Sequence, residues 1–142
     1  MLTPFREGTV LVLTESEQLA GIVAHAIESL GSSGPRLSTV RTLADCLVAL
    51  RLLSPCIVIV DDTGLAPVAA EALSEMHAAR SGTPIVYLTS QHTLDLEREI
   101  RQRGVLFYVQ LPDTAQQLDV VLGQLLARLV RETPARGAPR VH

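Results

Sequence analysis

One short stretch near the middle of the chain limits most strongly what it can fold into. Residues 54–64 read S-P-C-I-V-I-V-D-D-T-G, in which five apolar residues lie between a serine-proline pair and two aspartates with a turn signal. A short apolar run bounded in this way is typical of a strand buried on both faces in the middle of a parallel sheet. Asp61 and Asp62 then emerge at its carboxyl end, where open α/β sheets place their binding sites.

The composition indicates one globular domain. The 142 residues are 47% apolar and 19% charged, which argues against disorder and allows a proper core. No apolar run approaches the roughly 20 residues of a membrane helix and no signal-peptide pattern is present, so we expect a cytoplasmic protein. The net charge of −3 offers no general attraction to nucleic acid or anionic membrane, so neither is expected as a partner.

Two residue types narrow the chemistry further. The chain contains no lysine, which excludes any mechanism that needs a lysine amine within it. Cys46 and Cys56 are too few for a disulfide framework, and we expect buried thiols that act as small hydrophobes.

Short apolar runs alternate with amphipathic segments along the chain. Besides the central run, strands are predicted at residues 9–13, 36–40, 85–88 and 105–109. Helices are predicted from the capping box Thr14-x-x-Glu17 to Gly31, from Thr42 to Pro55, from Pro67 onward, over about 93–103, and from Pro112-Asp113-x-x-Gln116 to about 132.

Strict alternation of strand and helix predicts a parallel sheet covered on both faces, with right-handed crossovers. We therefore expect a flavodoxin-like (βα)5 three-layer sandwich. The run at 36–40 is the most polar and suits a sheet edge, so the order 2-1-3-4-5 fits best. Residues 1–132 form the expected domain, and 133–142 are predicted to be a flexible C-terminal tail.

In this topology, the first and third strands flank the switch point of the sheet. Thr14 and Glu15 end one of these strands, and Asp61 and Asp62 end the other. Three carboxylates therefore converge on one crevice, which ordinary packing does not require.

With these elements in this order, the chain resembles a receiver domain of bacterial two-component response regulators (CheY-like) over about residues 8–130. P-C-I-V-I-V-D, residues 55–61, is similar to the family's third strand, so the resemblance implies that Asp61 is the phosphoacceptor. T-P-I-V-Y-L-T-S, residues 83–90, resembles the fourth strand and implies Thr89 as the hydroxyl switch residue. G-V-L-F-Y-V-Q-L-P, residues 104–112, resembles the fifth and implies Tyr108 as the switch aromatic.

The chain departs from the family pattern around the acceptor. Where the family usually has two adjacent acids that hold Mg²⁺, this chain has Thr14-Glu15. Leu111 replaces the lysine before the fifth-strand proline, and Leu65 replaces the proline four residues after the acceptor. Glu15, Asp61 and the backbone carbonyl of Thr63 remain as ligands, so Mg²⁺ binding is expected to be weak. By analogy with the loss of an oxyanion-hole donor, loss of the lysine costs about 10²–10³ in rate. These departures indicate an atypical receiver, or pseudo-receiver.

Two functions stay open on this basis. The first is a phosphorylation-independent protein–protein interaction module of a two-component or phosphorelay pathway, which is not an enzyme. Its partner would be a histidine kinase or a downstream signalling protein, and its surface would be the fourth helix, fifth strand and fifth helix, through which we also expect a homodimer. The second is a working phosphoacceptor that is phosphorylated on Asp61 with Mg²⁺. Nothing positive supports a third reading, an enzyme or small-ligand binder that uses the same crevice.

Several of these residues also have ordinary structural explanations. Thr14 suits the N-cap of the first helix, and Glu15 suits its dipole. Asp62 is expected to be solvated. Thr89 and Tyr108 could be plain strand residues, and the histidines lack metal-ligand spacing, so they are assigned no role: His25, His77 and His92.

Overall fold

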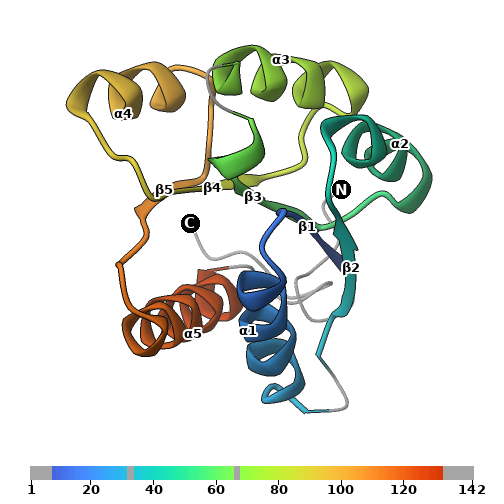
Figure 1. The fold of residues 1–142 in the computed structure, drawn as a ribbon. Helices are drawn as coiled ribbons and strands as arrows, with labels where there is room; N and C mark the ends of the chain where they lie inside the picture. Colours follow the sequence, from blue (N-terminus) through green and yellow to red (C-terminus); the bar gives the residue numbers. More distant parts are fainter. Residues whose placement is uncertain (1–7, 32–33, 66–67, 133–142) are drawn as a thin grey trace, which may run out of the picture.

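The chain folds around a five-stranded parallel sheet in the computed structural model, which describes residues 8–31, 34–65 and 68–132 (Figure 1). The strands are β1 (Thr9–Leu13), β2 (Arg36–Val40), β3 (Ile57–Asp61), β4 (Ile85–Thr89) and β5 (Phe107–Gln110). Their order is β2-β1-β3-β4-β5 and every neighbouring pair is parallel. The predicted flavodoxin-like order is therefore confirmed, with the polar β2 at one edge.

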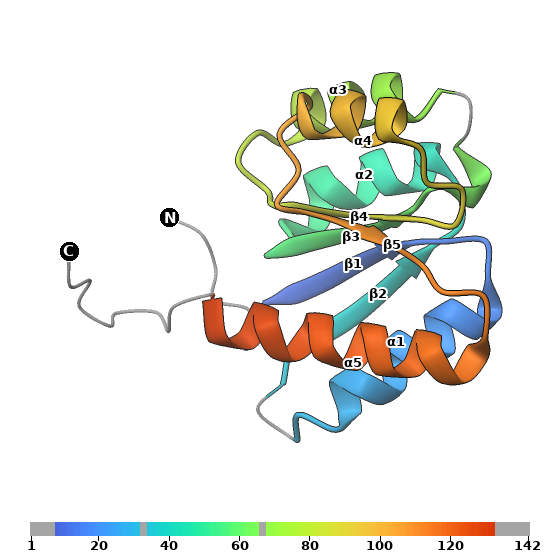
Figure 2. The same cartoon turned by 90° about the vertical axis from the view of Figure 1, so that its left-hand side faces the viewer.

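Helices cover both faces of this sheet. They are α1 (Glu17–Glu28), α2 (Leu43–Leu53), α3 (Ala69–Ala79), α4 (Leu94–Arg101) and α5 (Ala115–Glu132). Helices α1 and α5 pack side by side below the sheet and the other three lie above it, as Figure 2 shows. Within the described ranges, no helix combines the length and apolarity needed to cross a membrane.

The central strand β3 contributes side chains to the core on both faces of the sheet, because side chains alternate along a strand. All five of its residues are buried. Ile57 and Ile59 join the core against α1 and α5, whereas Val58 and Val60 join the core against α2, α3 and α4. The strand therefore belongs to the core on both sides of the sheet.

The two cysteines lie in different layers of the core. Both are buried and they are not joined by a disulfide, as predicted. Burial raises the pKa of each thiol to about 11, so they stay protonated at neutral pH.

Two of the predicted helix starts are confirmed and two need correction. Thr42 and Thr93 are N-caps whose hydroxyls accept from Asp45 N–H and Leu96 N–H. The N-cap of α1 is Ser16 and not Thr14, because the Thr14 side chain is buried in the crevice between β1 and β3. At α5, the Thr114 hydroxyl accepts from Gln117 N–H, a role that we had assigned to Asp113.

Other differences are small. β4 runs one residue further than predicted, to Thr89, and β5 begins two residues later, at Phe107. The proposed helix start at Pro67 and the predicted tail at 133–142 lie outside the described residues.

Candidate functional site

Asp61 lies at the carboxyl end of β3 with only 3% of its surface exposed. The Thr14 hydroxyl, at the end of β1, donates to Asp61 Oδ2 at 2.7 Å. Asp61 Oδ1 accepts from the Thr63 hydroxyl at 2.8 Å and from Thr63 N–H at 3.2 Å. Both oxygens of the implied phosphoacceptor are therefore already paired with donors of the protein.

A cavity of about 230 Å³ lies beside this carboxylate. Its lining combines the ends of β1 and β3 with the start of α2: Leu13, Thr14, Glu15, Arg41, Thr42, Leu43, Asp61, Leu65 and Val68. Of the three carboxylates predicted to converge on one crevice, Glu15 and Asp61 line this cavity, although Glu15 itself is exposed. Asp62 lines a different cavity. Arg41 was missed at the sequence level, because nothing in its local pattern places it near a strand that lies 20 residues further along the chain.

The residues at this edge suit a divalent cation poorly. Among the described residues, no group of three or more histidine, cysteine, aspartate or glutamate side chains is arranged to hold a metal ion. Thr63 directs its hydroxyl and its N–H at Asp61, and three hydrogen bonds already occupy that carboxylate. A metal would have to displace these donors, which disfavours tight binding.

Leu111 stands where a receiver usually carries its lysine. It is half-buried and packs against the core between the sheet and helices α1 and α5, so an apolar side chain occupies this position. Its N–H donates to the Thr89 carbonyl at 2.7 Å. The Thr89 side chain is fully buried and its hydroxyl accepts from Gln91 N–H at 3.1 Å, so it is held within the β4–α4 turn.

Asp62 is not solvated, which corrects the expectation from the sequence. Only 7% of it is exposed, and Tyr87 of β4 donates its hydroxyl to Asp62 Oδ2 at 2.7 Å. Tyr87 is itself fully buried. Desolvation, together with the bond to Asp62, raises the pKa of Tyr87 far above its usual range, so the phenol remains a donor.

Tyr108, the implied switch aromatic, stacks on Tyr87 with 5.7 Å between ring centroids and 11° between planes. Its hydroxyl lies 2.9 Å from Nδ1 of His92, in the turn between β4 and α4. Partial burial and the nearby Glu97 carboxylate raise the pKa of Tyr108. The sequence predicts no role for His92 because it lacks metal-ligand spacing, whereas its partner in the structure is a tyrosine.

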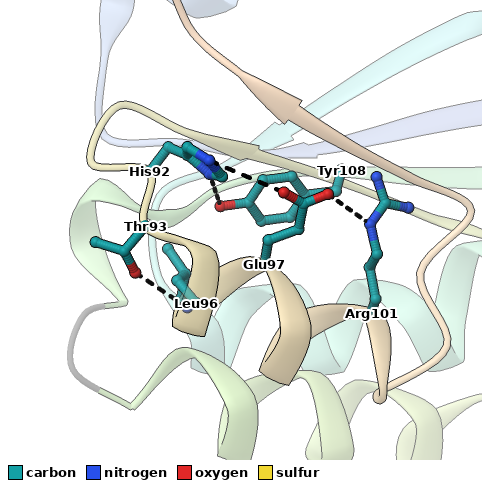
Figure 3. A network of polar contacts seen from close by, with 6 residues as sticks. All are labelled: His92, Thr93, Leu96, Glu97, Arg101 and Tyr108. Carbon is teal, nitrogen blue, oxygen red and sulfur yellow. Dashed lines mark hydrogen bonds and ion pairs between the residues drawn. The ribbon is translucent and has the colours of Figure 1, made fainter.

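The contacts continue from His92 onto α4 (Figure 3). Nε2 of His92 lies 3.9 Å from Glu97 Oε1, and Arg101 Nε donates to Glu97 Oε2 at 2.8 Å. The Arg101 guanidinium also lies 5.7 Å from the centre of the Tyr108 ring. An unbroken series of side-chain contacts thus runs from Asp62 to the surface of α4.

On the other side of β5, a groove of about 530 Å³ separates this strand from α5. Apolar side chains of both elements line it, together with Arg128 and Arg131. The Arg128 guanidinium lies 4.2 Å from the centre of the Phe107 ring, a cation–π distance. Among the described residues that line this groove, none is acidic.

Solved structures with a similar arrangement of elements include response regulators. The Mn²⁺-bound form of response regulator Rcp1 superimposes with a TM-score of 0.78 at 16% identity, covering 90% of this chain and 99% of that one. The fold is that of a response-regulator receiver domain.

Two further response regulators have a similar fold. The phosphorylated cyanobacterial phytochrome response regulator RcpA gives a TM-score of 0.77 at 13% identity over 92% of this chain and 99% of its own. A response regulator from Thermotoga maritima gives 0.72 at 17% identity over 89% and 99%. No family model matches the sequence, and no curated protein matches it either. The receiver fold predicted from the sequence is confirmed, and the likeness extends to fold alone.

Proposed function

We propose that the chain is a receiver-like interaction module of a two-component or phosphorelay-type signalling pathway, and that it acts without phosphorylation of Asp61. Its role is to bind a protein partner, a histidine kinase or a downstream signalling protein, and not to catalyse a reaction. Any Mg²⁺ site at its acceptor edge is weak.

The observation that carries this proposal is the state of the Asp61 carboxylate. Thr14 and Thr63 donate to both oxygens of Asp61, and these hydrogen bonds stabilise the carboxylate charge and so make the oxygens weaker nucleophiles. A phosphoryl group also needs positive charge close to its oxygens, and the apolar Leu111 fills the position from which the family lysine supplies it. Both features disfavour phosphorylation and leave the fold intact.

The proposed partner surface consists of α4, β5 and α5. Exposed Leu106 precedes β5, and the groove between β5 and α5 offers apolar side chains together with the two arginines Arg128 and Arg131. Helix α4 adds the acidic side chains of Asp95, Glu97 and Glu99. A surface with an apolar groove flanked by charges of both signs is suited to a specific protein partner, including a second copy of the chain.

Phosphorylation with acetyl phosphate tests the proposal directly. The protein is incubated with acetyl phosphate and Mg²⁺ and its intact mass is measured, with Asp61→Asn as the control. In the reaction at issue, an Asp61 oxygen attacks phosphorus and acetate leaves with the bridging oxygen. We expect no mass increase in either protein. A phosphoryl adduct that forms on the wild type and is lost in Asp61→Asn would refute a phosphorylation-independent role.

The alternative function is a working phosphoacceptor, and one observation favours it. The cavity next to Asp61 has Glu15 and Arg41 in its lining, so an anion that enters it would meet a guanidinium. In that case Arg41 would take over part of the role of the absent lysine. The same experiment with Arg41→Gln separates the two functions, because this variant would lose the adduct only if the arginine assists the transfer.

A further inference from the structure

Asp62 is a buried carboxylate without a cationic partner. Its hydrogen bond comes from the neutral Tyr87 hydroxyl, and no ion pair joins it to any of the described residues. Buried charges in proteins are almost always paired, because removal from water costs several kcal/mol unless an opposite charge compensates it. A carboxylate held in this way is a ready receptor for a positive charge.

The carboxylate lies at a small cavity that is separate from the one beside Asp61. This second cavity has a volume of about 170 Å³ and is lined by Asp62, Thr63, Ala69, Tyr87, Ser90, Gln91 and Leu96. Four of these residues, Thr63, Tyr87, Ser90 and Gln91, carry neutral polar groups that can form hydrogen bonds. Since water takes up about 30 Å³ per molecule in the liquid, the cavity has room for roughly five or six waters. It is too small for a drug-sized ligand, which needs about 300 Å³ or more.

We propose that this cavity binds a single organic cation, a guanidinium or ammonium group, with the Asp62 carboxylate as its counter-charge. Tyr87 keeps one carboxylate oxygen in place, and the second oxygen is available to the ligand. Ser90 and Gln91 supply acceptor groups for the remaining N–H donors. The volume of the cavity suits the end of an arginine or lysine side chain, or a small free amine.

The chain's own nearby arginines are engaged elsewhere. On α4, Arg98 lies 4.0 Å from Asp95 and Arg101 pairs with Glu97 at 2.8 Å. Arg103 donates to the Ser74 hydroxyl. A divalent metal is the weaker candidate, since among the described residues no cluster of three metal-binding side chains includes Asp62.

The site is connected to the proposed partner surface. A cation on Asp62 changes the charge next to the Tyr87 hydroxyl, and Tyr87 stacks on Tyr108, which contacts His92. Binding is measurable without any signalling partner, so this inference does not depend on the proposed function. If the cation site and the proposed function are both correct, cation binding at Asp62 affects the partner surface on α4 and β5.

The experiment is an NMR titration of the ¹⁵N-labelled full chain with ethylguanidinium chloride at neutral pH and constant ionic strength. We expect saturable shifts at the amides of Thr63, Ser90, Gln91 and Leu96. Asp62→Asn should weaken binding at least about tenfold, since it removes the counter-charge of a desolvated cation. The matched control is Asp119→Asn, which removes an exposed carboxylate on α5 and should leave the shifts unchanged.

Further arms identify the source of the cation. Butylammonium replaces ethylguanidinium in one arm, and a blocked glycyl-arginyl-glycine peptide replaces it in another. Tighter binding of the peptide indicates a partner's arginine, whereas equal or weaker binding indicates a free amine or guanidine. If Asp62→Asn fails to fold, Ser90→Arg is used instead, because a guanidinium at the cavity mouth should compete with the ligand.

Two results would overturn the inference. One is a linear, unsaturated shift that is the same in the wild type and in Asp62→Asn. The other is saturation of these amides by Mg²⁺ at lower concentration than by either organic cation, which would make the site a metal site.

Discussion

Thr14 donates its hydroxyl to Asp61 across the crevice between β1 and β3, at 2.7 Å and over a separation of 47 residues. In this way a neutral donor stands beside the acceptor carboxylate, where the family pattern has a second acid. The Thr14 hydroxyl also accepts from Ser16 N–H at 3.0 Å, which ties the start of α1 to the end of β3. The residue therefore has a structural role that an acid could fill only with added repulsion.

Removal of this hydroxyl should destabilise the fold. Thr14→Val keeps the shape of the side chain but leaves Asp61 Oδ2 without its buried donor, and we expect the free energy of unfolding to fall by about 1.5–3 kcal/mol. Urea denaturation measures the change. Thr39→Val, on the exposed side of edge strand β2, is the matched control and should stay within about 0.5 kcal/mol of the wild type. Equal stability of all three proteins would show that the hydrogen bond contributes nothing.

Restoration of the lysine should increase acceptor chemistry. Leu111→Lys places an ammonium where charge develops on a phosphoryl group, and combined with Thr14→Asp it returns two of the missing family features. We expect acetyl phosphate labelling of Asp61 to rise by about 10²–10³ in rate. Leu106→Lys adds the same charge at an exposed position one residue before β5 and should have no effect. If the double variant folds but Asp61 is not phosphorylated, the site lacks more than these two residues.

The buried Tyr87 makes the fold sensitive to alkali. Its pKa is raised in the folded state, so it keeps its proton where an unfolded tyrosine, with a pKa of about 10, loses it. This contribution to stability is complete below about pH 10 and declines as the pH rises above that value. Urea denaturation of the wild type at pH 9 and pH 11 should show this loss, and Tyr87→Phe should show a smaller one. A pH dependence unchanged by the substitution would contradict the assignment.

His92 should hold Tyr108 in place. In His92→Ala the Tyr108 hydroxyl loses its partner at 2.9 Å, and we expect a cost of about 0.5–1.5 kcal/mol together with a shifted or broadened Tyr108 ring signal. The chain has two tyrosines, so ¹³C-tyrosine labelling resolves each ring by NMR. The control is His25→Ala on the exposed face of α1. Unchanged Tyr108 signals in His92→Ala would remove His92 from the network.

Homodimerisation through α4, β5 and α5 remains a prediction. In a two-fold arrangement, arginines of α5 can meet acidic side chains of α4 from the other copy, so Arg128→Glu should weaken the dimer at least about tenfold. Light scattering over a range of concentrations measures this. Arg51→Glu, on the exposed face of α2, is the matched control. A wild type that stays monomeric at the highest concentration would exclude the dimer.

The sequence by itself determined the order and type of the elements. Most strands are short runs of β-branched, aliphatic or aromatic residues bounded by proline, glycine or capping residues. These signals act over a few residues, so they do not depend on the rest of the fold. The polar composition of Arg36–Val40 was enough to place β2 at an edge, and from this the strand order followed. The positions of Asp61, Thr89 and Tyr108 near strand ends followed for the same reason.

Only the tertiary structure decided which polar groups meet. Thr14 fits an N-cap by local pattern, yet the pairing of β1 with β3 places its hydroxyl on Asp61. Asp62 looks like a solvated turn residue, but the pairing of β3 with β4 places its carboxylate against the Tyr87 hydroxyl. His92 gains its partner only because β5 lies next to β4. These contacts join residues far apart in the chain, so their physical cause is the packing of the sheet, which no local sequence pattern records.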